Sequence, residues 1–138
     1  MAKNGPECAC GEGSGPEERK IRILFPCAGL ANVGQISNCA ALQLTEEGYG
    51  NATCIALLGS GNPGLMEGIA GANEVVIIDG CSNECGKKIA DSQGVGIAQH
   101  LIITGLGIEK VHSQDYTEDD IEKVVSAAWE GKGRVQDD

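Results

Sequence analysis

The five-residue run EVVII, over residues 74–78, constrains the fold of this chain more than any other segment. It is apolar in all but its first residue, which is typical of a strand buried on both faces of a parallel sheet. The run stops at Asp79 and Gly80, and a polar, helix-like segment follows as far as Ser92. A buried strand followed directly by a helix is the repeating unit of α/β domains. The run therefore predicts the centre of such a domain.

The remainder of the chain alternates strand and helix patterns in the same way. Four strand–helix units predict a single three-layer, Rossmann-like α/β domain, in which a four-stranded parallel sheet has helices on both faces. We expect the strand order 2-1-3-4, a common compact arrangement that places strands 1 and 3 side by side. The expected strands cover 21–25, 52–57, 74–78 and 99–104, and the expected helices cover 33–47, 63–72, a segment ending at 92, and 117–131.

The two ends of the chain differ from the expected domain, which covers residues 21–131. Residues 1–20 are rich in Gly, Pro, Ser and Glu, which predicts a disordered arm. This arm carries a CxC pair, Cys8 and Cys10, that could grip a soft metal. Residues 132–138 are expected to be a frayed tail.

The composition argues against nucleic acid and membranes as partners. The net charge is −10 with only 10 Lys and Arg residues, and 3% of residues are aromatic, so we expect neither a basic face for phosphates nor a stacking platform for bases. No apolar run reaches the length of about 18–20 residues that a membrane span needs. Residues 1–20 lack the apolar stretch of a signal peptide, so the expected location is the cytoplasm. There, the seven cysteines are expected to be metal ligands, redox groups or buried packing residues, not disulfides.

The cysteines that follow the expected strands form a candidate site. Cys81 and Cys85 stand four residues apart after the run 74–78, a spacing that puts both on one side of a helical turn. Cys27 follows the strand at 21–25, and adjacent parallel strands bring their carboxyl ends together, where open α/β sheets bind ligands. Cys54 joins these thiols if its strand ends at residue 54 or 55. If that strand continues to Leu58, Cys54 is buried about 10 Å below them.

Five motifs in this order resemble the DGC-domain family, which is named for its Asp-Gly-Cys sequence. They are PCAG at 26–29, GQISN at 34–38, Cys54, the segment DGCSNEC at 79–85, and TGLGIEK at 104–110. The resemblance covers roughly residues 21–112. It implies a zinc site on the four presumed chelating cysteines of the family, which fall here on Cys27, Cys54, Cys81 and Cys85. It implies no established reaction.

Four thiolates suit Zn²⁺, which binds them tetrahedrally, and the same ligands could hold an iron–sulfur cluster. The competing class is a thiol-based redox or sulfur-transfer enzyme, with Cys81 or Cys27 as nucleophile and Cys85 as resolving thiol. A phosphatase is excluded, because the sixth residue after Cys81 is Lys87 and not the arginine that phosphate binding would need. His100 lies in a strand pattern and is more typical of a core or edge histidine than of a general base.

A Gly-rich segment offers one further alternative. Residues 59–64, GSGNPG, match the GxGxxG pattern of dinucleotide-binding proteins. However, Pro63 removes a backbone N–H donor, and the chain lacks a second mononucleotide-binding half. A turn before a helix explains the segment better. The sequence therefore predicts a small cytoplasmic zinc-binding protein with a structural, regulatory, or metal- or redox-homeostasis role, and it identifies no protein partner.

Overall fold

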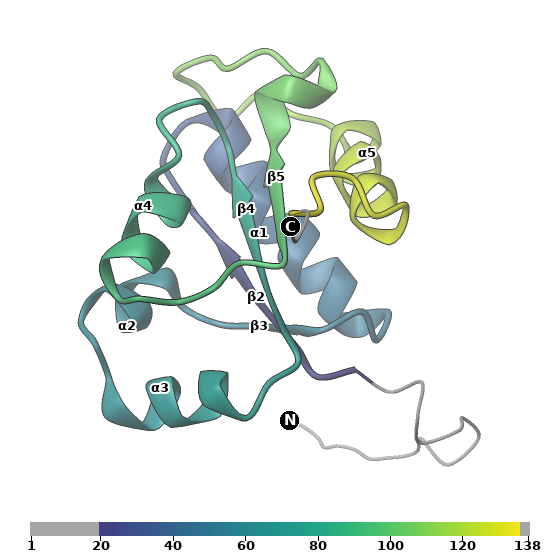
Figure 1. Cartoon of the computed structure of the whole chain (residues 1–138). Helices are drawn as coiled ribbons and strands as arrows, with labels where there is room; N and C mark the ends of the chain where they lie inside the picture. Colours follow the sequence, from purple (N-terminus) through teal and green to yellow (C-terminus); the bar gives the residue numbers. More distant parts are fainter. Residues whose placement is uncertain (1–19, 136–138) are drawn as a thin grey trace.

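The computed structural model describes residues 20–135 and contains one sheet of four parallel strands. The strand order is β3-β2-β4-β5, which confirms the predicted 2-1-3-4 arrangement with β2 and β4 side by side (Figure 1). The strands are β2 (Arg22–Pro26), β3 (Asn51–Ala52), β4 (Glu74–Asp79) and β5 (Gln99–Ile102).

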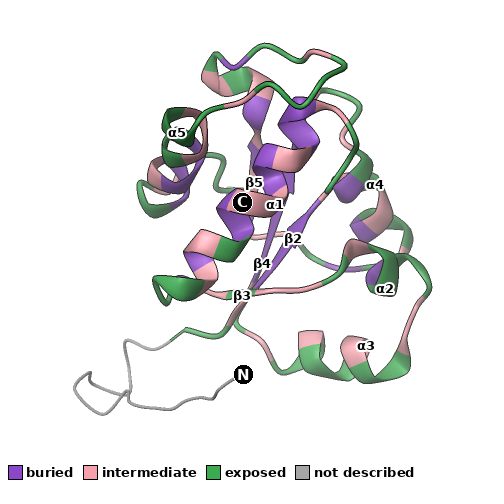
Figure 2. Ribbon diagram, turned by 180° about the vertical axis from the view of Figure 1, so that it is seen from behind, coloured by how far each residue is buried: buried purple, intermediate pink, exposed green. Residues whose placement is uncertain are grey.

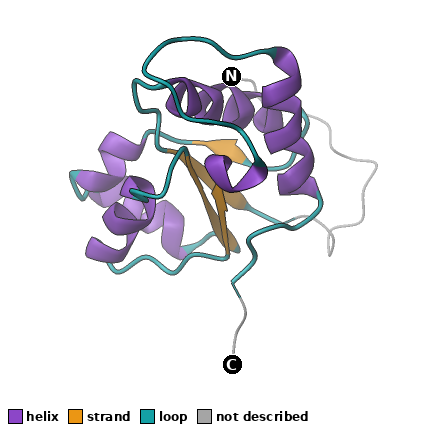
Figure 3. Ribbon diagram, turned by 90° about the horizontal axis from the view of Figure 1, so that it is seen from above, coloured by secondary structure: helices purple, strands orange, loops and turns teal. Residues whose placement is uncertain are grey.

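Helices cover both faces of the sheet, as predicted (Figure 3). One face packs against α1 and α5, and the other packs against α2, α3 and α4. The helices are α1 (Asn32–Glu46), α2 (Ile55–Gly59), α3 (Pro63–Ala70), α4 (Cys85–Ser92) and α5 (Glu118–Trp129), with a 3-10 turn, η3 (Ile103–Leu106), after β5.

Strand β4 supplies both hydrophobic cores, because successive side chains of a strand point to opposite faces. Val76 and Ile78 pack in the cluster under α1 and α5, whereas Val75 and Ile77 pack in the cluster under α2, α3 and α4. All four side chains are buried, and β2 and β4 form a continuous buried band through the molecule (Figure 2). The expectation of a central strand buried on both faces is confirmed.

The predicted strand at 52–57 is wrong. Strand β3 contains only Asn51 and Ala52, and the chain turns at Cys54 into the short helix α2. The Cys54 carbonyl accepts hydrogen bonds from the N–H groups of Leu57 and Leu58, which closes the first helical turn. A short apolar run fits a strand or a buried helix equally well, and here the burial of Leu58 against the second core favours the helix.

The chain after α5 stays against the sheet as far as Val135, although the sequence predicted a frayed tail from residue 132. The Gly133 carbonyl accepts from the His100 N–H at 2.8 Å, and the Val135 N–H donates to the Ala98 carbonyl at 3.0 Å. These bonds place residues 132–135 beside the free edge of β5. The last three residues, 136–138, and the expected arm with Cys8 and Cys10 lie outside the described residues.

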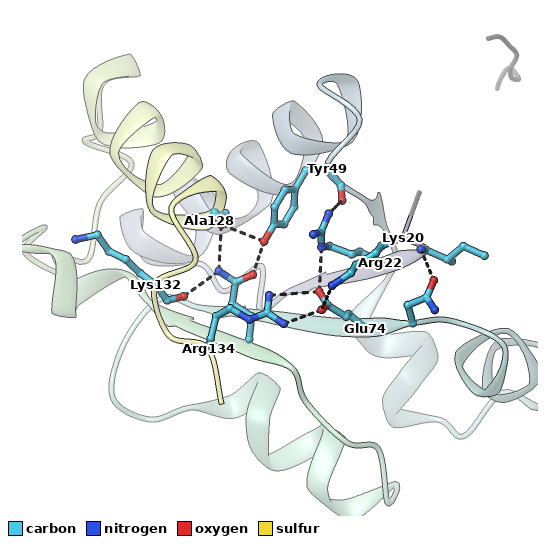
Figure 4. Close-up of polar contacts among 10 residues, drawn as sticks. Lys20, Arg22, Tyr49, Glu74, Ala128, Lys132 and Arg134 are labelled. Carbon is cyan, nitrogen blue, oxygen red and sulfur yellow. Dashed lines mark hydrogen bonds and ion pairs between the residues drawn. The ribbon is translucent and has the colours of Figure 1, made fainter. Parts of the chain in front are cut away.

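A cluster of ion pairs lies at the amino end of the sheet (Figure 4). Glu74, the first residue of β4, accepts from Lys20 at 3.2 Å, from Arg22 at 3.0 Å and from Arg134 at 2.7 Å. The cluster therefore joins β2 and β4 to the segment that follows α5. The thiols discussed below lie at the opposite end of the strands.

Within residues 20–135, the helices are too short or too polar for any of them to cross a bilayer.

Candidate functional site

Cys27 lies directly after β2, in a turn held by several hydrogen bonds. Its N–H donates to the Ile78 carbonyl at 2.9 Å, and its Sγ accepts from the Gly80 N–H at 3.3 Å. The next residue, Ala28, has a left-handed backbone with φ 56°, a conformation uncommon outside glycine. Its N–H donates to the Ser37 hydroxyl of α1 at 3.1 Å. The turn thus places the Cys27 sulfur against the end of β4.

Gly80 is needed for space, not for a left-handed backbone. It is absent from the glycines with positive φ. A Cβ at this position would lie 2.9 Å from Val33 Cγ2 and 3.1 Å from the backbone nitrogen of Gly34. The start of α1 therefore lies directly on the Gly80 backbone, and only glycine allows this approach without movement.

Asp79 is buried, with 1% of its surface exposed, and it caps helix α4. Its Oδ1 accepts from the Gly86 N–H at 2.7 Å, and its Oδ2 accepts from the Lys87 N–H at 3.2 Å. These are among the N–H groups that a helix start leaves without a partner inside the helix. The second oxygen also contacts His100 Nε2 at 2.8 Å. The aspartate of the DGC motif is therefore a structural link between β4, β5 and α4.

The structure brings three of the four predicted thiols to one cavity. Cys27, Cys81 and Cys85 line a cavity of about 230 Å³ at the carboxyl ends of β2 and β4. Cys81 is half-buried and Cys85 is exposed at the first position of α4. Glu84, immediately before it, has a left-handed backbone with φ 55°. Strained residues of this kind cluster at functional sites.

Cys54 lies beside these thiols and not among them. It is exposed and lines an adjoining cavity of about 480 Å³, of which Cys27 is also a wall. Strand β3 ends at Ala52, before either of the two expected end points, and Cys54 is exposed, so the expected alternative in which it is buried below the other thiols is wrong. Over residues 20–135, no three side chains of His, Cys, Asp or Glu already stand close enough to hold one metal ion.

Lys110 is a site residue that the sequence analysis did not identify. Its Nζ lies 3.4 Å from Cys81 Sγ, and it lines the same cavity. The buried side chain of Asn32 holds its loop: Nδ2 donates to the Glu109 carbonyl at 2.9 Å, and Oδ1 accepts from the Val111 N–H at 2.8 Å. The TGLGIEK motif contains this lysine, so the motif marked the segment but not its contact.

The Gly-rich segment at 59–64 forms a turn between two helices. Gly59 ends α2, and Pro63 begins α3. The Asn62 side chain accepts from the Leu65 N–H at 2.9 Å, so the chain itself caps the helix start that a pyrophosphate would need. This arrangement favours the turn over the dinucleotide site.

Comparison with known proteins adds a family and one relative. The sequence model of the DGC domain matches residues 23–128, a range that includes all four predicted thiols. The chain is 28% identical over 104 residues to the anaerobic and virulence modulator AnvM of Pseudomonas aeruginosa. The aligned region covers 75% of this chain and 79% of that protein. No solved structure matches the chain.

Proposed function

The chain belongs to the DGC-domain family, and on that premise we propose that it is a zinc-binding protein with Cys27, Cys54, Cys81 and Cys85 as ligands. The observation that carries the proposal is the single cavity lined by Cys27, Cys81 and Cys85. Cys54 lines the adjoining cavity, and Cys27 is common to both. Both cavities lie at the carboxyl end of the parallel sheet, where α/β proteins bind their ligands.

The donor set fits zinc chemically. Four thiolates are the ligands of closed, tetrahedral structural zinc sites. Two groups would stabilise the negative charge of these thiolates: the Gly80 N–H, which donates to Cys27 Sγ, and the Lys110 ammonium, which donates to Cys81 Sγ. Partners of this kind orient metal ligands and tune the affinity of the site.

The thiols must turn toward one another to share an ion, because no three of them already do so in residues 20–135. The buried residues of the two hydrophobic cores are aliphatic and aromatic, and of the four thiols only Cys81 packs against one of these cores. We therefore propose a regulatory role, in which metal binding reorganises the loops around 26–34 and 79–88 and leaves the sheet intact. The relative AnvM is described as a modulator, which supports a regulatory role.

A thiol-based redox or sulfur-transfer reaction at Cys81 and Cys85 is the second candidate function. The contact between Lys110 and Cys81 favours it, because a nearby ammonium stabilises an attacking thiolate as well as a metal-bound one. Cys54 separates the two candidates, since a nucleophile with a resolving thiol needs no third or fourth cysteine.

The test is the zinc content and the zinc affinity of protein purified without oxygen, for the wild type, Cys54→Ser and Cys39→Ser. Cys39 is the matched control, because it is half-buried on α1 and contacts Tyr116 instead of the cavity. We expect about one zinc per chain in the wild type and in Cys39→Ser. Cys54→Ser should bind zinc at least about tenfold more weakly, because serine is a poor ligand for a soft metal.

Three other results would contradict or change the zinc proposal. Reduced wild-type protein that binds no zinc from an excess would contradict the proposal. A brown protein that bleaches in air would replace zinc with an iron–sulfur cluster. Unchanged zinc affinity in Cys54→Ser would leave three thiolates and an open coordination position, which is typical of catalytic zinc.

A further inference from the structure

Helix α4 begins at Cys85, and the side chain of its N-cap residue makes no capping hydrogen bond. The N-cap residue is Glu84, whose left-handed backbone is accompanied by no capping bond from its side chain. Helix starts leave N–H groups without partners, and a capping side chain normally satisfies one of them. Here Asp79, at the end of β4, takes the N–H groups of Gly86 and Lys87.

Helix α4 also lies unusually close to Asp79. A Cβ on Gly86 would stand 2.8 Å from Asp79 Oδ1 and 2.8 Å from Ile77 Cγ2. The position of Cys85, one residue earlier, therefore follows directly from the position of the Asp79 carboxylate. A rotation of that carboxylate would remove the acceptors of the Gly86 and Lys87 N–H groups.

His100 holds the carboxylate in this orientation. In the sheet register His100 lies opposite Ile77, and Asp79 is two residues further along the same face. His100 Nε2 lies 2.8 Å from Oδ2, and the ring tautomer with a proton on Nε2 donates to this oxygen. The His100 side chain is 12% exposed, and its backbone N–H donates to the Gly133 carbonyl, so the strand residue that carries the ring is held in place.

We propose that His100 is a positioning residue of the thiol site: through Asp79 it fixes the first turn of α4 and hence the place of Cys85 relative to Cys81 and Cys27. The effect on metal binding rests on the proposed function, whereas the effect on α4 does not. The His100 side chain itself does not line the cavity.

The experiment compares His100→Phe, which removes the donor and keeps a ring, with His100→Gln, which keeps an N–H donor. His112→Gln is the control, because His112 is exposed and lies outside the cavity lining. Two readouts need no metal: amide hydrogen exchange at Gly86 and Lys87, and the rate at which iodoacetamide alkylates Cys85. A third is the thiolate-to-metal charge-transfer absorption during Co²⁺ titration.

In His100→Phe we expect exchange at Gly86 and Lys87 to become at least about tenfold faster. Alkylation of Cys85 should change severalfold while that of Cys54 stays constant, because general destabilisation would affect both thiols. Co²⁺ affinity should fall about 10- to 100-fold, as is usual when a partner of a metal ligand is lost. His100→Gln should restore most of each effect, and His112→Gln should match the wild type.

Wild-type exchange at Gly86 and Lys87 in folded His100→Phe would overturn the inference, as would equal changes at Cys85 and Cys54. If His100→Phe does not fold, His100→Leu replaces it, since leucine also removes the ring donor and leaves the Asp79 carboxylate unchanged. A wild type that binds no Co²⁺ would count against the proposed function alone, because exchange and alkylation still decide the role of His100.

Discussion

The ion cluster around Glu74 allows a quantitative test of the structure. The carboxylate is 9% exposed and accepts from Lys20, Arg22 and Arg134 (Figure 4). The hydrogen bond from Arg134 is the main cause that lowers the pKa of Glu74 from 4.5 to about 2, and Arg22 and Lys20 add to it. Glu74→Gln keeps the shape of the side chain and removes the charge.

The difference between these pKa values corresponds to about 3.4 kcal/mol, at about 1.36 kcal/mol per pKa unit. The side chains of Lys20 and Arg134 are 52% and 40% exposed, so water and salt screen their charges. We therefore expect Glu74→Gln to lower the free energy of unfolding by about 1–2 kcal/mol at pH 7.

The pH dependence has a definite sign. The pKa of Glu74 is lower in the folded state than in the unfolded chain, so its contribution is complete above pH 4.5 and is lost as the pH falls toward about 2. Urea unfolding followed by circular dichroism at pH 7, 5 and 3 measures the difference between wild type and variant. That difference should be equal at pH 7 and 5 and smaller by about half at pH 3.

Glu67→Gln is the matched control, because Glu67 is exposed on α3 and has no ion pair within residues 20–135. It should change the free energy of unfolding by less than about 0.5 kcal/mol. A difference for Glu74→Gln that stays constant from pH 7 to pH 3 would refute the reasoning, since it would come from altered packing and not from charge.

Three further outcomes are expected. Gly80→Ala should lower the free energy of unfolding by about 1–3 kcal/mol in thermal denaturation, because its Cβ would lie 2.9 Å from Val33. Gly68→Ala is the control: its Cβ would have nothing within 4 Å, so it should be neutral or stabilising, and equal losses in the two variants would contradict the steric argument. Thr117→Ala should cost about 1 kcal/mol in urea unfolding through loss of its bond to the Asp120 N–H, and an unchanged midpoint would contradict the capping role. If zinc binds as proposed, a chelator should lower the melting temperature while the far-ultraviolet circular dichroism persists, because the buried residues of both cores are aliphatic and aromatic. Collapse of that signal would contradict this expectation.

Local patterns were enough to predict the fold wherever the pattern and the burial agreed. The run at 74–78 could bury its apolar side chains on both faces only between two helical layers, and the structure places it there. The run around 52–57 had no such constraint, because a few apolar residues beside a sheet edge can bury Leu58 from a helix as well as from a strand. The C-terminal residues could not be predicted for another reason: hydrogen bonds to His100 and Ala98, more than 30 positions earlier in the chain, hold Gly133 and Val135.

The same difference between local sequence patterns and distant contacts applies to the candidate site. Topology alone brought Cys27 and Cys81 together, since both follow strands that are neighbours in the sheet. The place of Cys54 depended on where one short strand ends, which periodicity does not determine. Lys110 and His100 reach the site through contacts with residues 29 and 21 positions away, Cys81 and Asp79, and no local pattern reports such contacts.

The order of the residues in the DGC motif follows from the alternation of side chains along β4. Ile77 and Asp79 face α4, so the carboxylate meets the start of that helix, and Gly86 leaves room for it. Ile78 and Gly80 face α1, so the position without a side chain meets Val33 and Gly34. Exchanging the two residues would aim a buried carboxylate at the crowded α1 side and leave α4 without its cap. The end of β4 therefore meets two helix starts with a hydrogen-bond acceptor facing α4 and a glycine facing α1, and the next residue, Cys81, lines the cavity that Cys27 and Cys85 also line.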